Sequence, residues 1–379
     1  MIKPKLHQLS EAELISWIRL IRTNNIGRST FFNLLKIFNN AQTAIENIEE
    51  FSIRGGLKKP IKPYDKNAAI KELEATRNFG ADIIGFTEEA YPKMLREISD
   101  PPPILTVKGK INLLNQNIIA IVGPRNASFN GCKFARKIAK ELGENEMIIA
   151  SGLARGIDTA AHEASLTTGT IAVIAGGINN IYPSENANLY HQISNQGVII
   201  SEIPFGTLPR GGNFPQRNRI ISGLSLGVVI VEATLKSGTL ITAKFALEQN
   251  REIFAVPGNP MDPRYEGTNR LIKQGAKMLE NTDDILNEIK YMRQEDEKLS
   301  KSFEPESHEF TSFISNLSDN SDIDKARNLI LKKLNFTEIT NDEIIRELEI
   351  PTQIVNIALV QLELADKIQN KNGKIILKG

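Results

Sequence analysis

Five short apolar runs, each ending in a polar loop that carries glycine, constrain the fold of this chain more than any other feature. The runs lie at 118–122, 147–150, 171–175, 228–231 and 252–256. Buried parallel strands read as continuous apolar runs of this kind, because both faces of their sheet are covered. Helical patterns follow most of the runs, for example at 134–142 and 241–247. Alternating strands and helices predict an α/β fold with a Rossmann-like, doubly wound parallel sheet.

The first of these loops supplies groups that bind anions. Parallel strands end at one edge of their sheet, and open α/β sheets bind ligands at that edge. The loop at 123–131 offers Arg125 and a helix N-terminus capped by Ser128, a combination that suits a single phosphate. It lacks the close glycine pair of the dinucleotide fingerprint. Taken alone, the loop is equally compatible with an ordinary strand-to-helix turn.

Two further loops repeat this chemistry. The loop at 151–158 carries Arg155 together with glycines that free backbone N–H groups. Another loop places Ser237 and Gly238 before a helix that carries Lys244 about 1.5 turns further on, so that its ammonium could reach back to the same edge. One such loop is weak support. Three on one edge predict an anion site built from cations and backbone N–H groups.

The strongest local pattern is a connection at 209–219 that combines arginines, asparagines and an aromatic ring. Its members are Arg210, Asn213, Phe214, Arg217, Asn218 and Arg219. Arginines hold phosphates, a phenylalanine face stacks a base, and asparagine amides read base edges. This combination suits single-stranded nucleic acid better than duplex. The alternative is a helix N-terminus whose arginines pair with acids elsewhere in the domain.

Composition limits where such a site can lie. The formal net charge is +1, so a nucleic-acid site must be a local basic patch and not a field of the whole molecule. The single cysteine, Cys132, cannot form an internal disulfide, and a reducing compartment is the default. The first residues are too polar for a signal peptide, and no apolar run approaches the ~20 residues of a membrane span. We therefore expect a cytoplasmic protein with no membrane contact.

The chain of 379 residues divides into four expected regions. These are a helical leader of the SAM or helix-hairpin-helix type at 1–110, the Rossmann-like core at 111–290, an acidic linker at 291–324, and a winged-helix domain at 325–379. The linker is expected to be disordered, because 291–320 is low in apolar residues and holds three basic against seven acidic residues, 3 − 7 = −4 in formal charge.

Two segments outside the core could contact nucleic acid. The turn at 23–29, between two helices of the leader, can grip a nucleic-acid backbone or serve as a packing module, and we favour packing. In the tail, three helices precede a hairpin centred on Asn372-Gly373. The third helix, 351–365, would be the recognition helix, but it contains no Lys or Arg. A protein-contact or regulatory role is therefore expected for the tail ahead of direct DNA reading.

Catalytic patterns are sparse. The sequence contains no HExxH motif, no paired cysteines and no nucleophile elbow, so we expect neither a metal, a cofactor nor an enzymatic activity. His162 follows Asp158 by four residues on one helix and is expected to be structural. Glu232, at the end of its strand, is the best isolated acid; alternatively it holds Arg217 or Arg219.

Several long motifs then occur in a fixed order. They are Ser151-Gly-Leu-Ala-Arg-Gly-Ile-Asp158, Ile181-Tyr-Pro183, Asn213-Phe-Pro-Gln-Arg-Asn-Arg-Ile-Ile221, Ser237-Gly-Thr-Leu-Ile-Thr-Ala243 and Phe254-Ala-Val-Pro-Gly258. Together they resemble the bacterial DNA-processing protein A family (DprA, also called Smf), and the likeness extends upstream through Tyr91-Pro92 and 100–103. The resemblance implies a core that binds single-stranded DNA without cutting it. It further implies a homodimer through the core that protects incoming strands during natural transformation (competence) and helps load the RecA recombinase.

The resemblance also implies a set of site residues. Carried over by position, the binding pocket uses Arg125, Phe214, Arg217, Asn218 and Arg219, and Lys244 matches a basic position of the family. Arg155 belongs to a matching motif. One departure lies in the first loop, where Pro124 replaces the hydroxyl residue of the more common Gly-Thr-Arg or Gly-Ser-Arg. Pro124 removes a hydroxyl and a backbone donor from that loop.

Two competing functions remain. Related Rossmann-like nucleoside-monophosphate phosphoribohydrolases follow a glycine-rich loop with a catalytic glutamate, and Thr242 stands at that place here. The missing carboxylate would leave a ribosyl cation without its stabilising group, so this enzyme is the lesser alternative. A transcription regulator that works through the tail is disfavoured by the uncharged helix at 351–365.

Overall fold

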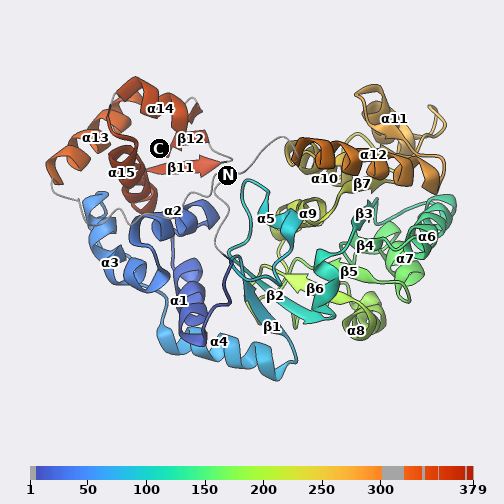
Figure 1. Ribbon diagram of the computed structural model, residues 1–379, viewed down its shortest axis with the longest axis horizontal. Helices are drawn as coiled ribbons and strands as arrows, with labels where there is room; N and C mark the ends of the chain where they lie inside the picture. Colours follow the sequence, from blue (N-terminus) through green and yellow to red (C-terminus); the bar gives the residue numbers. More distant parts are fainter. Residues whose placement is uncertain (1–5, 301–319, 335–337, 349, 372–373, 379) are drawn as a thin grey trace. The chain divides into compact units, whose positions relative to one another are not determined.

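The computed structural model describes residues 6–300, 320–334, 338–348, 350–371 and 374–378 (Figure 1). The chain forms two compact units, each described by itself below. The core unit comprises 74–98 and 105–306, and the leader–tail unit comprises 2–73, 99–104 and 307–379. Within the described residues, no helix is both long enough and apolar enough to span a bilayer.

A nine-stranded sheet organises the core unit, in the order β1-β2-β6-β5-β4-β3-β7-β8-β9. The strands are β1 (Asp82–Gly85), β2 (Ile104–Gly109), β3 (Ile118–Val122), β4 (Ile148–Ser151), β5 (Thr170–Val173), β6 (Val198–Ser201), β7 (Gly227–Ile230), β8 (Glu252–Ala255) and β9 (Lys277–Met278). All five predicted strands are confirmed as β3, β4, β5, β7 and β8. They run parallel to their neighbours, whereas β2 pairs antiparallel with β6.

The structure corrects the expected extent of the helical leader. β1 and β2 fall inside 1–110, yet both belong to the core sheet. β2 follows the prolines at 101–103, which cannot continue a helix, and its Thr106 and Val107 pair with Ser201 and Ile200. A short apolar run before the core was therefore a strand that the helical pattern upstream concealed.

Helices cover both faces of the sheet, because alternate strand residues point to opposite sides. From β3, Ile119 and Ile121 pack with α6, α7 and α12, while Ile118, Ala120 and Val122 face the cluster formed by α5, α9 and α10. These helices are α5 (Lys93–Arg96), α6 (Phe129–Glu144), α7 (Ile157–Ser165), α9 (Asn213–Leu224), α10 (Thr239–Glu248) and α12 (Thr282–Ser300). The remaining ones are α8 (Ala187–Gln196), α11 (Glu266–Lys273) and the 3-10 turns η1 (Ile111–Asn115), η2 (Ser184–Asn186) and η3 (Pro263–Tyr265).

The leader–tail unit combines both ends of the chain. Its leader holds α1 (Glu11–Arg22), α2 (Arg28–Phe38) and α3 (Ala41–Arg54), and α4 (Lys66–Asn78) follows. The tail holds α13 (Asn320–Lys333), α14 (Asn341–Leu348), α15 (Thr352–Leu364), and a sheet of β10 (Ile339–Thr340), β11 (Ile368–Lys371) and β12 (Lys374–Leu377) in the order β10-β12-β11. Three helices and a hairpin confirm the predicted winged helix; the turn residues 372–373 lie outside the described residues.

The expected linker differs from the structure at its start. α12 continues to Ser300, so 291–300 are helical, and α13 begins at Asn320. The central part of the expected linker, 301–319, lies outside the described residues.

Candidate nucleic-acid interface

A hollow of about 470 Å³ opens at the carboxyl edge of the core sheet, where β3 lies between β4 and β7. At this point the strand order reverses direction along the chain, which is where doubly wound sheets bind ligands. The hollow is lined by Val122, Gly123, Pro124, Arg125, Asn126, Ala154, Asp158, Phe214, Pro215, Arg217, Asn218, Ser237, Gly238, Thr239, Ile241 and Thr242. The loops after β3, β4 and β7 and the start of α9 therefore meet in one place, as the sequence predicted.

Arg217 is the most unusual group in the hollow. Its side chain is 7% exposed, and its Nε has no hydrogen-bond partner among the described residues. The guanidinium lies against Gly152, where any Cβ would overlap it. Burial lowers the pKa of Arg217 to about 10, opposed by the charge of Asp158 and reinforced by that of Arg125. A guanidinium keeps its charge at that pKa, so the hollow is lined by a desolvated cation.

An aromatic pair stands beside this cation. The Arg125 guanidinium lies 4.8 Å from the centroid of the Phe214 ring, and the Tyr182 ring lies 5.6 Å from it in a tilted arrangement. Tyr182 is 45% exposed and lines a smaller recess next to the hollow, together with Arg155 and Pro183. Sequence reasoning noted Tyr182 only as part of a family motif and did not assign it to the site. Its place after the β5 loop gave no pattern that points to a ligand.

Glycine at 156 brings two of the loops together. Its φ is +79°, and a Cβ there would overlap the Pro124 carbonyl oxygen and lie 2.7 Å from that of Arg125. Only glycine fits this combination of left-handed backbone and close approach. The loop after β4 thereby supports the loop that carries Arg125.

Other predicted residues lie at the rim or wall of the hollow. Asn218, Ser237 and Gly238 line it, and the Ser237 hydroxyl accepts a hydrogen bond from the Thr239 backbone at 3.2 Å. Arg155 is exposed and forms an ion pair with Glu185 at 3.3 Å, so part of its charge is compensated. These positions belong to the same edge of the sheet as Arg217.

Like Arg155, which lines only the smaller recess, four further predicted residues are not among those that line the hollow. Arg219 is 2% exposed and forms an ion pair with Glu202. Asn213 donates to the Ala175 carbonyl at 3.1 Å, and Lys244 is exposed on α10 beside Glu248. Ser128 caps α6, as predicted, but its hydroxyl and backbone N–H both engage Glu232. The helix that carries Arg217 thus presents one arginine to the hollow and turns the other into the fold.

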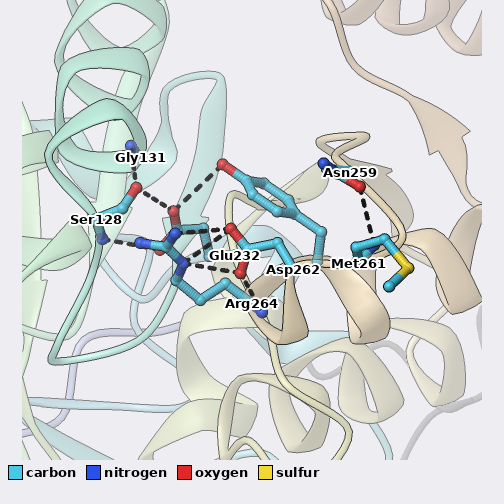
Figure 2. Close-up of polar contacts among 8 residues, drawn as sticks. Ser128, Gly131, Glu232, Asn259, Met261, Asp262 and Arg264 are labelled. Atoms are coloured by element: carbon cyan, nitrogen blue, oxygen red, sulfur yellow. Dashed lines mark hydrogen bonds and ion pairs between the residues drawn. The ribbon is translucent and has the colours of Figure 1, made fainter.

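Glu232 has a partner that the sequence did not suggest. Figure 2 shows its carboxylate between the start of α6 and the segment before α11, where it accepts hydrogen bonds from Ser128 and, at 3.4 Å, from the Tyr265 hydroxyl. The side chain is fully buried. The expectation that Glu232 holds Arg217 or Arg219 is therefore wrong: it ties the first loop to the loop after β8.

Backbone N–H groups contribute less to the site than the sequence predicted. The Asp158 carboxylate accepts from the N–H groups of Gly152 and Ala154 at 3.1 and 3.3 Å, and His162 Nε2 accepts from that of Leu153 at 3.3 Å. Burial raises the pKa of Asp158 and lowers that of His162 to about 3. The predicted structural role of His162 fits these contacts. These three N–H groups of the loop after β4 are bonded within the protein. The attraction of the hollow for an anion therefore comes mainly from Arg125 and Arg217.

Acidic groups are scarce around the hollow. Of its lining residues only Asp158 carries a carboxylate, and that group is buried beneath Arg217. Thr242 lies in the wall and is 1% exposed, so a hydroxyl stands where the phosphoribohydrolase pattern has its glutamate. Within the described residues, His, Cys, Asp and Glu do not form a group able to hold a metal ion.

Three family models match successive parts of the chain. The model of the DNA recombination-mediator protein A family matches 82–290, a DprA-like N-terminal HHH domain matches 11–75, and a DprA winged helix domain matches 318–374. The first of these alone covers more than half of the 379 residues.

Individual relatives agree with the family models. The DNA processing protein DprA of Bacillus subtilis is 45% identical over 220 residues, which are 57% of this chain and 74% of that protein. The crystal structure of DprA from Streptococcus pneumoniae superposes with a TM-score of 0.61 at 32% identity, covering 74% of this chain and 99% of the other. A structure of DprA from Helicobacter pylori, described for its single-stranded DNA binding mode, gives a TM-score of 0.51 at 31% identity over 55% of this chain and 95% of the other. With its core, leader and tail all matched, the chain belongs to the DNA recombination-mediator protein A (DprA/Smf) family.

Proposed function

We propose that this protein binds single-stranded DNA in the hollow at the β3/β7 edge. The observation that carries the proposal is a pair of cations, Arg217 and Arg125, that line the same hollow, where Asp158 is the one carboxylate among the lining residues. A phosphate in the hollow would accept hydrogen bonds from these guanidinium groups, and charge-assisted hydrogen bonds to phosphate are about twice as strong as neutral ones. The single-stranded DNA binding mode described for the Helicobacter pylori relative supports the same ligand.

The aromatic pair favours an unpaired strand over a duplex. Base faces are accessible only when a base leaves its stack, and each base stacked on an aromatic side chain contributes about 1–3 kcal/mol without sequence preference. Tyr182 is partly exposed next to Phe214, at the side of the hollow where Arg155 stands. With phosphates at Arg125 and Arg217 and a base on this aromatic pair, one nucleotide step of the strand would cross the carboxyl edge of the core sheet.

Binding without cleavage is part of the proposal. Asp158 is held by two backbone N–H groups. At the wall position where a glutamate would stabilise a ribosyl cation, this protein has Thr242. His162 is fully buried and holds the Leu153 N–H, so it is not placed to move a proton at the hollow. Release of free base from nucleoside monophosphates by the purified protein would contradict this part.

Family membership supports the wider role. We propose that the protein acts in the cytoplasm as a homodimer through its core unit. There it would protect incoming single strands and help load the RecA recombinase in natural transformation. The matched core and the DprA relatives are the support for this role.

An electrophoretic shift with one oligonucleotide as single strand and as duplex tests the proposal. Wild type should prefer the single strand. Arg217→Ala should weaken single-strand binding by about 1.5–3 kcal/mol, roughly 10- to 150-fold, because hydrogen bonds to a charged group are lost. The matched control is Lys244→Ala, which removes one positive charge from a side chain outside the hollow. Equal losses in the two variants, or a preference for duplex, would contradict the proposal.

A further inference from the structure

The third helix of the tail, α15, is covered on most of its surface. Between residues 355 and 365 only Asn356 is exposed and Glu363 half-buried, and the other nine residues are buried. Successive helical residues turn by 100°, so these nine occupy about 260° of the circumference, and Thr352, Asn356 and Glu363 share the remaining stripe. An apolar face this wide must be buried against more than one partner. α15 packs against α13 of its own domain and also against α2 and α3 of the leader.

The contact with the leader reaches the backbone of α15. At the end of α3, a Cβ on Gly55 would overlap the Gln361 carbonyl oxygen and lie 3.0 Å from the Ala365 Cβ. Such close approach requires a residue without a side chain at 55. Beside it, the ammonium end of the Lys367 side chain lies over Gly56. The end of α3 and the last turns of α15 thus pack backbone to backbone.

The leader turn takes part in the same contact. Asn25 lies in the turn between α1 and α2 with φ +62°, and its amide donates to the Leu364 carbonyl at 3.1 Å. Leu364 is the last residue of α15, where carbonyl groups have no partner within the helix. The leader turn therefore caps the last turn of α15.

We propose that α15 is a docking helix for the leader, and that its last turns and the leader turn mask each other in the intact chain. A recognition helix exposes basic side chains to a groove, whereas α15 presents its buried surface to α2, α3 and α13, and its exposed first turn carries no Lys or Arg. The partner of the tail is therefore the first three helices of the same chain. This proposal is independent of the single-strand site.

Gly55 offers a substitution that strains only this contact. Its φ and ψ are −65° and −13°, an ordinary helical conformation that any residue adopts, so Gly55→Leu leaves the leader backbone unstrained. The matched control is Gly27→Ala, because a Cβ at Gly27 would meet nothing within 4 Å. A second, milder variant is Asn25→Gly, which keeps the left-handed turn and removes the amide that holds Leu364.

The measurement is the rate at which a thiol at the contact reacts in the full-length chain. Ala365→Cys places that thiol on a residue that is 7% exposed, and the natural Cys132 serves as internal reference when each site is followed by mass spectrometry. The typical cost of overpacking corresponds to a factor of about 5 to 150 in an equilibrium constant, so Gly55→Leu should raise the rate about fivefold or more. Asn25→Gly should raise it less, and Gly27→Ala should leave it unchanged.

Two results would overturn the proposal. One is a rate that stays unchanged in both Gly55→Leu and Asn25→Gly. The other is an Ala365→Cys protein without further substitutions whose tail thiol becomes reactive when duplex DNA is added, because the tail would then leave the leader to read DNA. Single-strand affinity should be the same in all these variants, so a failure here is distinguishable from a failure of the core site.

Discussion

The hollow of the core unit and the α15 contact of the leader–tail unit handle polar groups in opposite ways. In the hollow, Arg217 is buried with an Nε that has no partner among the described residues, and Arg125 stands beside it. At the α15 contact, the Asn25 amide and the Leu364 carbonyl satisfy one another. Both regions come from segments whose sequences suggested nucleic acid. Only the first leaves donors for a ligand.

Residue type alone does not locate a binding site. Arginine 217 and arginine 219 lie two positions apart on α9, yet the second is compensated by Glu202 within the fold. A buried polar group without a partner costs free energy until a ligand supplies one. The Nε of each arginine has no hydrogen-bond partner among the described residues, so the position at the open hollow, and not the missing partner, distinguishes Arg217.

The largest expected effect separates these two arginines by stability. Arg219→Ala removes the ion pair to the partly buried Glu202 carboxylate and should lower the free energy of unfolding by about 3–5 kcal/mol. Arg217→Ala should cost less stability, because the Asp158 carboxylate keeps its hydrogen bonds to the N–H groups of Gly152 and Ala154. Urea unfolding of both variants checks this. If the two lost equal stability, the distinction between the hollow and the compensated interior would fail.

A second prediction concerns the aromatic pair. Tyr182→Ala and Phe214→Ala should each weaken single-strand binding by about 1–3 kcal/mol, because a stacked base loses its platform. Tyr182→Phe is the control, since it keeps the ring and removes only the hydroxyl. Fluorescence anisotropy with a labelled oligonucleotide measures all three. A loss in Tyr182→Phe as large as in Tyr182→Ala would assign the effect to the hydroxyl and not to stacking.

The interior beneath the hollow should respond to pH. The pKa of His162 is lowered from 6.5 to about 3, so between these values the unfolded state binds a proton that the folded state does not. The free energy of unfolding should therefore fall as pH drops from about 6.5 towards 3, by up to ~1.4 kcal/mol per pH unit from this group.

His162→Asn isolates that contribution. The variant should be less stable at pH 7, because the contacts to Leu153 and Thr170 are weakened, and its stability should depend less steeply on pH. Urea midpoints at pH 7, 5.5 and 4.5 compare the two proteins. Parallel pH profiles would show that His162 does not carry the expected shift.

The smallest effect is expected at the rim. Arg155→Ala removes an exposed ion pair with Glu185 and should change stability by at most about 1 kcal/mol, as is typical of surface pairs. Its effect on single-strand affinity should be smaller than that of Arg217→Ala, because Glu185 already compensates part of its charge. An Arg155→Ala variant as weak in binding as Arg217→Ala would move the centre of the site to the rim.

Much of the fold followed from periodicity. Continuous apolar runs identified the central strands. In the tail, helical spacing predicted the helices and the Asn372-Gly373 turn signal predicted the hairpin. Four strands of the core sheet, β1, β2, β6 and β9, were missed. In β2, Ile104–Gly109, a brief run after three prolines gave too little pattern to distinguish a strand from the end of the leader.

The site was predictable in position but not in detail. The rule for carboxyl ends of parallel strands located the hollow and brought Arg125, Phe214 and Arg217 together. Sequence spacing could not show that Arg219 points to Glu202, or that the N–H groups of the loop after β4 are satisfied by Asp158. Those outcomes depend on partners that are distant in sequence and meet only after folding.

The salt dependence of single-strand binding tests the central claim most directly. Wild-type affinity should fall by about 0.7 log units per log unit of salt for each phosphate contact. Arg217→Ala should reduce that slope by about 0.7, the contribution of one phosphate contact. Lys244→Ala should leave the slope nearly unchanged. A wild-type slope near zero, or a slope that is insensitive to Arg217→Ala, would contradict a phosphate-binding cation in the hollow.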